Sequence, residues 1–182
     1  MSPEEVVALF GPPETEIIAA KVGPMVYEKA LAEYYALYGD KTAALGAYPG
    51  IKELLRDLAA AGCRLGVVTG KGRPTTDQTL RRTGTADFFQ VVVSGHDVAR
   101  PKPDPEGIRR ALTLLGAGAE ETVYVGDMGS DALAAKGAGV AFAGAAWDRR
   151  RWENLAVAGA GLVFTSPAKL GAWLLRDKAF EG

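Results

Sequence analysis

Short apolar runs alternate with helical segments along most of the chain from Tyr48 onward. The runs expected to form strands cover residues 65–69, 90–94, 122–125, 140–143 and 162–165. Between them the apolar residues recur at helical spacing, as in Ile51, Leu54 and Leu58. Continuous apolar strands separated by helices are typical of a parallel sheet that is covered on both faces. The pattern therefore predicts an α/β fold with a Rossmann-like parallel sheet.

The first part of the chain shows helical spacing only. Ser2-Pro3-Glu4-Glu5 has the pattern of a capping box, with proline at the first helical position. Gly11-Pro12-Pro13 ends that helix, and helical spacing resumes from Glu14 to Tyr38 with a break at Gly23-Pro24. We expect two domains, a helical one over residues 1–46 and the Rossmann-like core over residues 47–182.

The amino-acid composition and net charge exclude some classes of binding partner. The 182 residues carry a formal net charge of −1 without a block of like charges, so neither nucleic acid nor a membrane surface is expected as a partner. The single cysteine, Cys63, fits a reducing cytosol, and neither a signal peptide nor an apolar run of about 20 residues is present. These features predict a cytoplasmic protein. A single histidine, His96, excludes multi-histidine metal sites.

Polar residues follow three of the predicted strands. In open parallel sheets, ligands gather at the carboxyl ends of the strands, so these residues are candidates for a site. Carboxylates are ligands that Mg²⁺ prefers, and lysine and backbone N–H groups neutralise phosphate oxygens. The set therefore suits a phosphoryl group held beside Mg²⁺. Its members are Thr69, Gly70, Lys71, Lys102, Asp127 and Asp131.

Each of these residues also has a plainer interpretation. Asp127 and Asp131 could cap the helix that follows them, because acidic groups are favoured near a helix N-terminus. Lys102 could be a solvated loop residue, and Thr69 could simply end a strand. His96 and Arg100 could contact a substrate, although we favour a surface or structural role for both.

Three motifs in order resemble the haloacid dehalogenase-like hydrolase superfamily, in its phosphoglycolate phosphatase-like branch. They are "VVTGK", "RPKPDPEG" and "VYVGDMGSDALAAKGAG". The resemblance implies Mg²⁺-dependent hydrolysis of a small phosphorylated metabolite, and it makes residues 1–46 a partial helical cap. It implies that the Thr69 hydroxyl binds the transferring phosphoryl group and that Lys102 stabilises a phosphoaspartate. Asp127 would be a direct Mg²⁺ ligand, and Asp131 a second ligand or one acting through water. Gly70 stands where this branch usually has asparagine, which removes a side-chain donor.

The first motif of that family, an apolar strand ending in D-x-D-x-T, is not found in the sequence. Its first aspartate would be the nucleophile and its second the general acid and base. Asp40, Asp57, Asp87 and Asp104 all lack the apolar strand that should precede them. The absent strand would be the central one, between the strands that carry Thr69 and Asp127. Its loss would remove ladder partners from both neighbours, and we expect the chain to close the gap, to pair with another subunit as a homo-oligomer, or to be less well folded.

Three explanations of the missing motif remain. Either the recorded start lies downstream of the true one, or the chain is truncated and inactive, or the protein is a non-catalytic relative that binds phosphate or Mg²⁺ or serves as a regulatory module. A phosphoryl mutase of the same family is a further alternative. For the 182-residue chain as written we expect no measurable turnover.

Overall fold

The computed structural model describes residues 12–42, 44, 46–147 and 161–176. The helices are α2 (Glu14–Lys21), α3 (Pro24–Lys41), α4 (Ile51–Ala60), α5 (Arg73–Thr83), α6 (Glu106–Leu115), α7 (Gly129–Ala138) and α9 (Pro167–Leu174). The short 3-10 helices are η1 (Ala86–Phe88) and η2 (Gly95–Asp97). The strands are β1 (Gly66–Val68), β2 (Val91–Val93), β3 (Val123–Gly126), β4 (Ala141–Ala145) and β5 (Val163–Phe164). The predicted helix after Ser2 and the helix expected after residues 140–143 lie outside the described residues.

Every strand pair among the described residues is parallel, as the apolar pattern predicts. They form two sheets, one with the order β1-β2 and one with the order β3-β4-β5. Gly66 pairs with Val91 in the first sheet, and Val123 pairs with Ala141 in the second. The observed strands are mostly shorter than the predicted runs, because the ladder covers only the residues that face a neighbouring strand.

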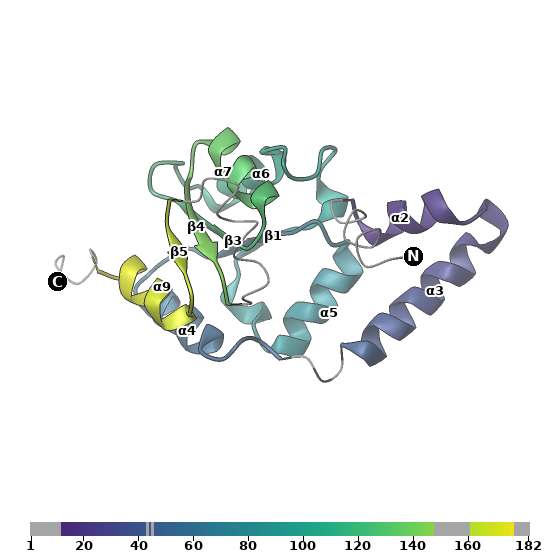
Figure 1. Cartoon of the computed structure of the whole chain (residues 1–182), viewed down its shortest axis with the longest axis horizontal. Helices are drawn as coiled ribbons and strands as arrows, with labels where there is room; N and C mark the ends of the chain where they lie inside the picture. The colour runs from purple at the N-terminus through teal and green to yellow at the C-terminus, as the bar shows by residue number, and fades with distance from the viewer. Residues whose placement is uncertain (1–11, 43, 45, 148–160, 177–182) are drawn as a thin grey trace.

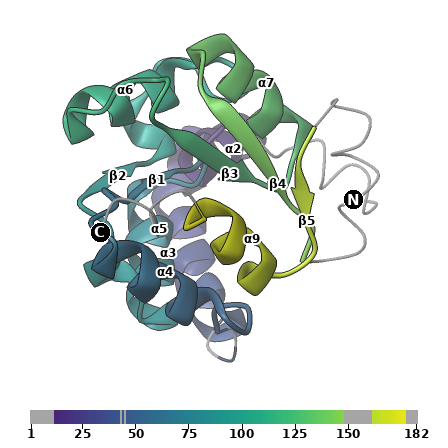
Figure 2. The same cartoon turned by 90° about the vertical axis from the view of Figure 1, so that its left-hand side faces the viewer.

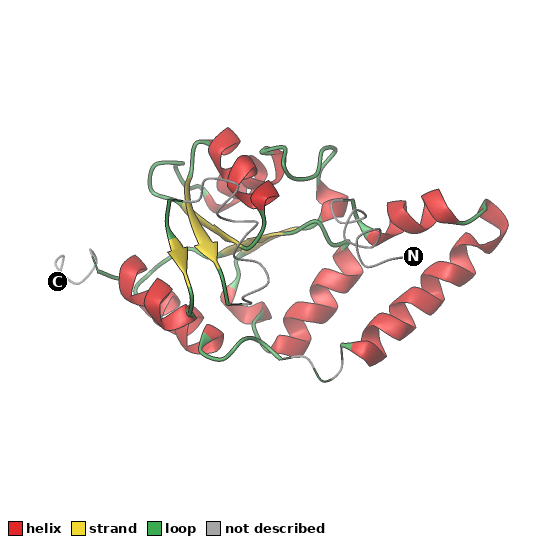
Figure 3. Cartoon of the chain, viewed as in Figure 1, coloured by secondary structure: helices red, strands yellow, loops and turns green. Residues whose placement is uncertain are grey.

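Helices cover both faces of the strands, giving three layers (Figures 2 and 3). On one face Leu54 and Leu58 of α4 and Leu170 of α9 pack against Ala143 of β4. On the other face a second cluster joins Ile108 of α6 with residues of α7. The amphipathic spacing of α4 and α6 explains these layers, because each helix directs its apolar side toward the strands. The predicted α/β fold is confirmed.

The two sheets belong to one layer that is interrupted between β1 and β3. Leu65 and Val123 pack against the same core cluster, and Val68 and Tyr124 both pack against the other. Among the described residues, however, no strand pairs with both β1 and β3. Val125 of β3 remains 37% exposed, which is high for a strand that lies between two helical layers. The interruption lies where the absence of a central strand is expected.

Helices α2 and α3 form a pair at one end of the molecule, beside α5 and away from the strands (Figure 1). Tyr38 of α3 contacts Thr79 of α5 through their hydroxyls, at 2.8 Å. Arg82 of α5 also donates to the carbonyl oxygen of Gly39. Polar contacts therefore join this pair to the rest of the molecule. None of the helices described here is both long and apolar enough to cross a lipid bilayer.

Candidate functional site

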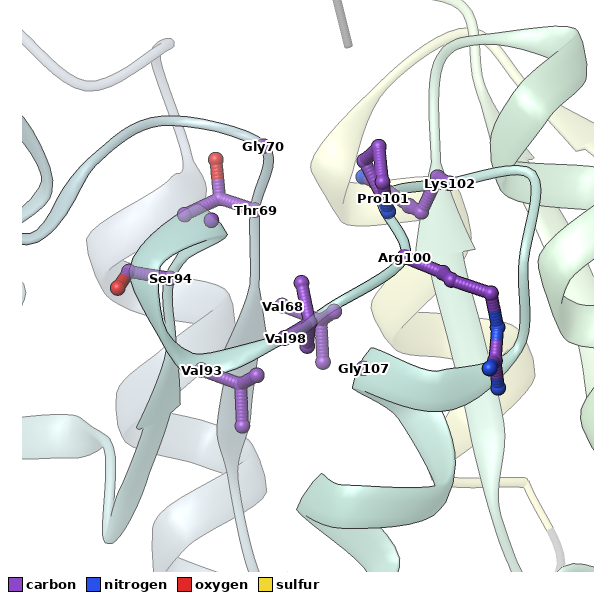
Figure 4. A pocket seen from close by; sticks show the side chains of 11 residues that line it. Val68, Thr69, Gly70, Val93, Ser94, Val98, Arg100, Pro101, Lys102 and Gly107 are labelled. Atoms are coloured by element: carbon purple, nitrogen blue, oxygen red, sulfur yellow. The ribbon is translucent and has the colours of Figure 1, made fainter. Parts of the chain in front are cut away.

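A small pocket lies at the carboxyl ends of β1 and β2. Thr69 and Gly70 line it on one side, and Arg100, Pro101 and Lys102 line the other (Figure 4). Ser94, which is fully buried, lines the pocket as well. The pocket therefore brings together Thr69, Gly70 and Lys102, three residues predicted from separate motifs.

Hydrogen bonds hold the loop after β1 in place beside this pocket. The Thr69 N–H donates to the carbonyl oxygen of Val93, at 2.9 Å, which continues the β1–β2 ladder past its last pair. The Lys71 N–H donates to the Thr69 hydroxyl oxygen, at 3.2 Å, so the hydroxyl keeps its own proton for another acceptor. A Cβ atom on Gly95 would come within 2.5 Å of the Gly70 carbonyl oxygen. Glycine at position 95 thus permits the close approach of the two strand ends.

Lys102 connects the pocket to the end of β3. Its ammonium donates to Asp131 Oδ1 at 2.6 Å and to the Tyr124 hydroxyl at 3.1 Å. The Lys102 side chain is 20% exposed and the Asp131 side chain 5% exposed, so this ion pair is largely shielded from water. The Lys102–Pro103 peptide bond is cis. Lys102 is thus a buried partner of Asp131, and the interpretation as a solvated loop lysine is wrong.

Asp131 holds the loop that carries Asp127. Its Oδ2 accepts the N–H groups of Asp127, at 3.1 Å, and of Met128, at 3.0 Å, at the start of α7. A Cβ atom on Gly126 would lie within 2.5 Å of the Asp131 Cβ, so the packing here requires glycine. The structure therefore confirms the helix-capping interpretation for Asp131, and this carboxylate also neutralises Lys102.

The charges of this cluster are strongly coupled. Burial alone would lower the pKa of Lys102, but Tyr124 and the Asp131 carboxylate outweigh it and raise the pKa above the usual lysine value. Burial raises the pKa of Tyr124 to about 12, although the nearby Lys102 charge lowers it. Lys102 is consequently a stable cation and Tyr124 a neutral hydroxyl at physiological pH.

The residues at the end of β3 fit a magnesium ion that takes few protein ligands. In the described part of the chain, no group of three or more histidine, cysteine, aspartate or glutamate side chains gathers as a metal site. Both oxygens of Asp131 accept hydrogen bonds, from Lys102 and from the N–H groups of Asp127 and Met128. Mg²⁺ commonly uses one or two carboxylates together with water and substrate phosphate. Asp131 orders the loop that carries Asp127, and the assignment of Asp127 and Asp131 as Mg²⁺ ligands stays a prediction.

The remaining predicted contacts point elsewhere. The Lys71 ammonium donates to the Tyr38 hydroxyl at 2.9 Å, on the side of α3, and Lys71 is not among the residues that line the pocket. Arg100 lines the pocket, but its guanidinium is paired with Asp104 at 2.7 Å. His96 Nε2 lies 2.8 Å from the Thr15 hydroxyl of α2. His96 and Arg100 therefore have the structural contacts that the sequence analysis favoured.

Two residues of this region were not predicted to belong to the site. Tyr124 reaches Lys102 and also lies 3.2 Å from the Val68 carbonyl oxygen across the interrupted sheet. A hydroxyl within an otherwise apolar strand is the one signal in the sequence that could have indicated it. Glu14 is 6% exposed and contacts the loop after β1, and no local pattern distinguishes it from an ordinary first-turn acid.

Comparison with known proteins identifies the relatives of this chain. The model of a family described as haloacid dehalogenase-like hydrolase matches residues 1–145. A pyrophosphatase PpaX of Bacillus velezensis is 39% identical over 84% of this chain and 70% of its own length. A phosphoglycolate phosphatase of Rhodospirillum rubrum is 41% identical over 79% of this chain and 60% of its own length.

The structure also has close neighbours among solved structures. CbbY from Rhodobacter sphaeroides in complex with phosphate has a TM-score of 0.76 and is 27% identical, covering 93% of this chain and 80% of that one. The chain spans between half and about seven tenths of the length of the relatives that it matches by sequence.

Proposed function

Because this chain belongs to the haloacid dehalogenase-like hydrolase family, we propose that it carries the phosphate-binding and metal-binding part of a Mg²⁺-dependent phosphomonoester hydrolase. The substrate is a small phosphorylated metabolite, of the kind that phosphoglycolate represents. One observation carries the proposal. Thr69 and Lys102 line opposite sides of a single pocket, and Lys102 is ion-paired with the aspartate that orders the Asp127 loop.

Different residues would bind different parts of the phosphoryl group. The Thr69 hydroxyl and the Gly70 N–H donate to phosphate oxygens, and the Lys71 N–H orients the Thr69 hydroxyl. Lys102 supplies a fixed positive charge beside them, and its orientation is set by Asp131 and Tyr124. Because these groups are held before a ligand arrives, little reorganisation opposes binding.

Asp127 completes the site on the side of β3. It would hold Mg²⁺, which when bound neutralises negative charge on the phosphoryl oxygens. Asp131 contributes by fixing the backbone N–H groups of Asp127 and Met128. Lys71, whose ammonium contacts Tyr38, serves the site through its backbone and not through its side chain.

We further propose that the 182-residue chain binds phosphate without turning it over. Aspartate and glutamate do not occur among the described residues that line the pocket, so the described site offers no carboxylate nucleophile there. A non-catalytic phosphate-binding or Mg²⁺-binding module is thus the second candidate function, and it is favoured by the same observation. A phosphoryl mutase would need the same missing nucleophile.

Two measurements on the purified chain test these proposals. Calorimetric titration with inorganic phosphate in the presence of Mg²⁺ should show binding, and Asp127→Asn should abolish its Mg²⁺ dependence. Asp57→Asn, which removes an exposed acid on α4, is the matched control and should change nothing. Phosphate that fails to bind the unaltered protein at millimolar concentration would sink the proposed site.

Turnover is tested separately with p-nitrophenyl phosphate and Mg²⁺. We expect no release of phosphate above the rate without protein. Release that Asp127→Asn removes and Asp57→Asn does not would show that the chain is a complete enzyme.

A further inference from the structure

Glu14 is a buried acid outside the pocket. It is the first residue of α2, and only 6% of it is exposed. Its Oε2 accepts the Gly72 N–H at 2.7 Å, and its Oε1 accepts the Thr75 hydroxyl at 3.0 Å. A buried carboxylate is costly unless donors of this kind satisfy it, so the contacts are specific features of the fold.

These contacts place Glu14 at the N-terminus of α5. Gly72 is the N-cap of that helix and offers no side chain of its own to its first turn. From a different helix, Glu14 accepts the N–H of this N-cap residue and the Thr75 hydroxyl, next to the positive end of the α5 dipole. The Glu14 carboxylate also acts on Tyr34: burial, and then this carboxylate, raise the pKa of Tyr34 to about 12.

Gly72 ends the loop of residues Thr69–Gly72, which begins at the pocket. The rest of the molecule holds this loop at Thr69, through Val93, and at Lys71, whose carbonyl oxygen accepts the Gly95 N–H at 2.8 Å. The α2–α3 pair holds it at Gly72 through Glu14, and at the Lys71 ammonium through Tyr38.

Gly72 is closely surrounded, so a larger residue does not fit at this position. A Cβ atom there would come within 2.6 Å of Glu14 Oε1 and within 2.8 Å of His96 Cε1. Pro13, just before Glu14, lies beside Gly95, whose own Cβ position is 3.1 Å from the Pro13 Cβ. The start of α2 is therefore packed directly against the loop and the strand end that line the pocket.

We propose that Glu14 is a positioning residue for the phosphate site: it holds the Thr69–Gly72 loop in the conformation that receives a phosphoryl group. Glu14 acts through Gly72 and does not touch the phosphate. The inference rests on the proposed function, and it adds that docking of the α2–α3 pair and phosphate affinity are coupled. By thermodynamic reciprocity, phosphate strengthens the docking by the factor with which docking strengthens phosphate binding.

The test compares Glu14→Ala, Glu14→Gln and Glu16→Ala by calorimetric titration with inorganic phosphate and Mg²⁺. Glu14→Ala loses both acceptors, and we expect phosphate affinity to fall about tenfold. Glu14→Gln keeps an oxygen that can accept the Gly72 N–H, so it should restore most of the affinity. Glu16→Ala removes the same charge from an exposed position of the same helical turn and should leave affinity unchanged.

A destabilised variant separates positioning from general loss of stability. Leu58→Ala removes a buried side chain of α4 that packs in the cluster with Ala143 and Leu170 and does not line the pocket. At a temperature where both variants are folded, Leu58→Ala should bind phosphate normally and Glu14→Ala should not. Equal losses in the two variants, or wild-type affinity in Glu14→Ala, overturn the proposal.

Hydrogen exchange at the Gly72 amide gives a readout that needs no phosphate. Faster exchange at Gly72 in Glu14→Ala, and unchanged exchange in Glu16→Ala, is the expected result. If the unaltered protein does not bind phosphate, the proposed function fails while this exchange result still decides whether Glu14 holds the loop. Unchanged Gly72 exchange in Glu14→Ala overturns the positioning role.

Discussion

Lys102 Nζ lies 2.6 Å from Asp131 Oδ1, which joins the loop after η2 to the first turn of α7. Both side chains are largely withdrawn from water, and the carboxylate also accepts two backbone N–H groups. One contact thus organises the two loops from which the proposed phosphate and metal ligands project.

Removing the acid of this pair should be costly. Asp131→Asn leaves the Lys102 charge buried without its counterion, and we expect the free energy of unfolding to fall by about 3 kcal/mol. Urea unfolding monitored by circular dichroism measures the change. Glu121→Gln, which breaks the exposed pair with Arg64, is the control and should cost less than about 1 kcal/mol. A loss at Asp131 no larger than at Glu121 contradicts the buried role.

The contribution of Lys102 to the free energy of unfolding should be lost at high pH only. The folded state raises the pKa of Lys102, so its stabilisation is fully present below the unfolded-state pKa of about 10.4 and disappears as pH rises through the higher folded-state pKa. The difference in unfolding free energy between the wild type and Lys102→Met should be constant from pH 7 to about 9 and change only above about 10.4. A difference that already changes between pH 7 and 9 would show that another group governs it.

Gly126 is expected to tolerate no side chain. A Cβ atom at this position would meet Asp131 Cβ at 2.5 Å and Asp131 Cγ at 2.6 Å. Gly126→Ala must displace the carboxylate from the N–H groups that it accepts, and we expect a loss of about 1–3 kcal/mol in thermal unfolding. Gly46→Ala is the comparison, since nothing lies within 4 Å of its Cβ position. Similar melting temperatures for the two variants would refute the steric argument.

The Tyr124 hydroxyl should stabilise the interrupted sheet by a small amount. It lies 3.2 Å from the Val68 carbonyl oxygen and accepts from the Lys102 ammonium at 3.1 Å, so Tyr124→Phe removes the link between β3 and β1 together with one partner of Lys102. The expected cost is about 1 kcal/mol in urea unfolding, with the fold retained. Tyr48→Phe, at a side chain that is 51% exposed, serves as the control and should be neutral. Equal stability of the two variants would mean that the hydroxyl makes no net contribution.

The order of elements and the strand-end positions of Thr69, Lys102 and Asp127 were predictable because they depend on local patterns. Apolar runs of strand length and helical spacing such as Ile51, Leu54 and Leu58 are readable within a few residues. The interruption between β1 and β3 was also predictable, since it follows from a motif that is missing. The direction of the Lys71 ammonium was not, because it depends on Tyr38, which lies 33 positions away in the sequence.

The sequence by itself thus determined the α/β architecture and, to within one or two residues, where each strand ends, since backbone periodicity and turn chemistry act locally. Tertiary structure alone decided that Asp131 accepts hydrogen bonds from Lys102 and from two backbone N–H groups. It also decided that the Tyr124 hydroxyl of β3 contacts the Val68 carbonyl oxygen of β1. It also decided that Glu14, an acid with an ordinary first-turn position, is buried against Gly72. Such roles depend on distances between segments that only the folded chain brings together, and hydrogen-bond partners are chosen by that proximity.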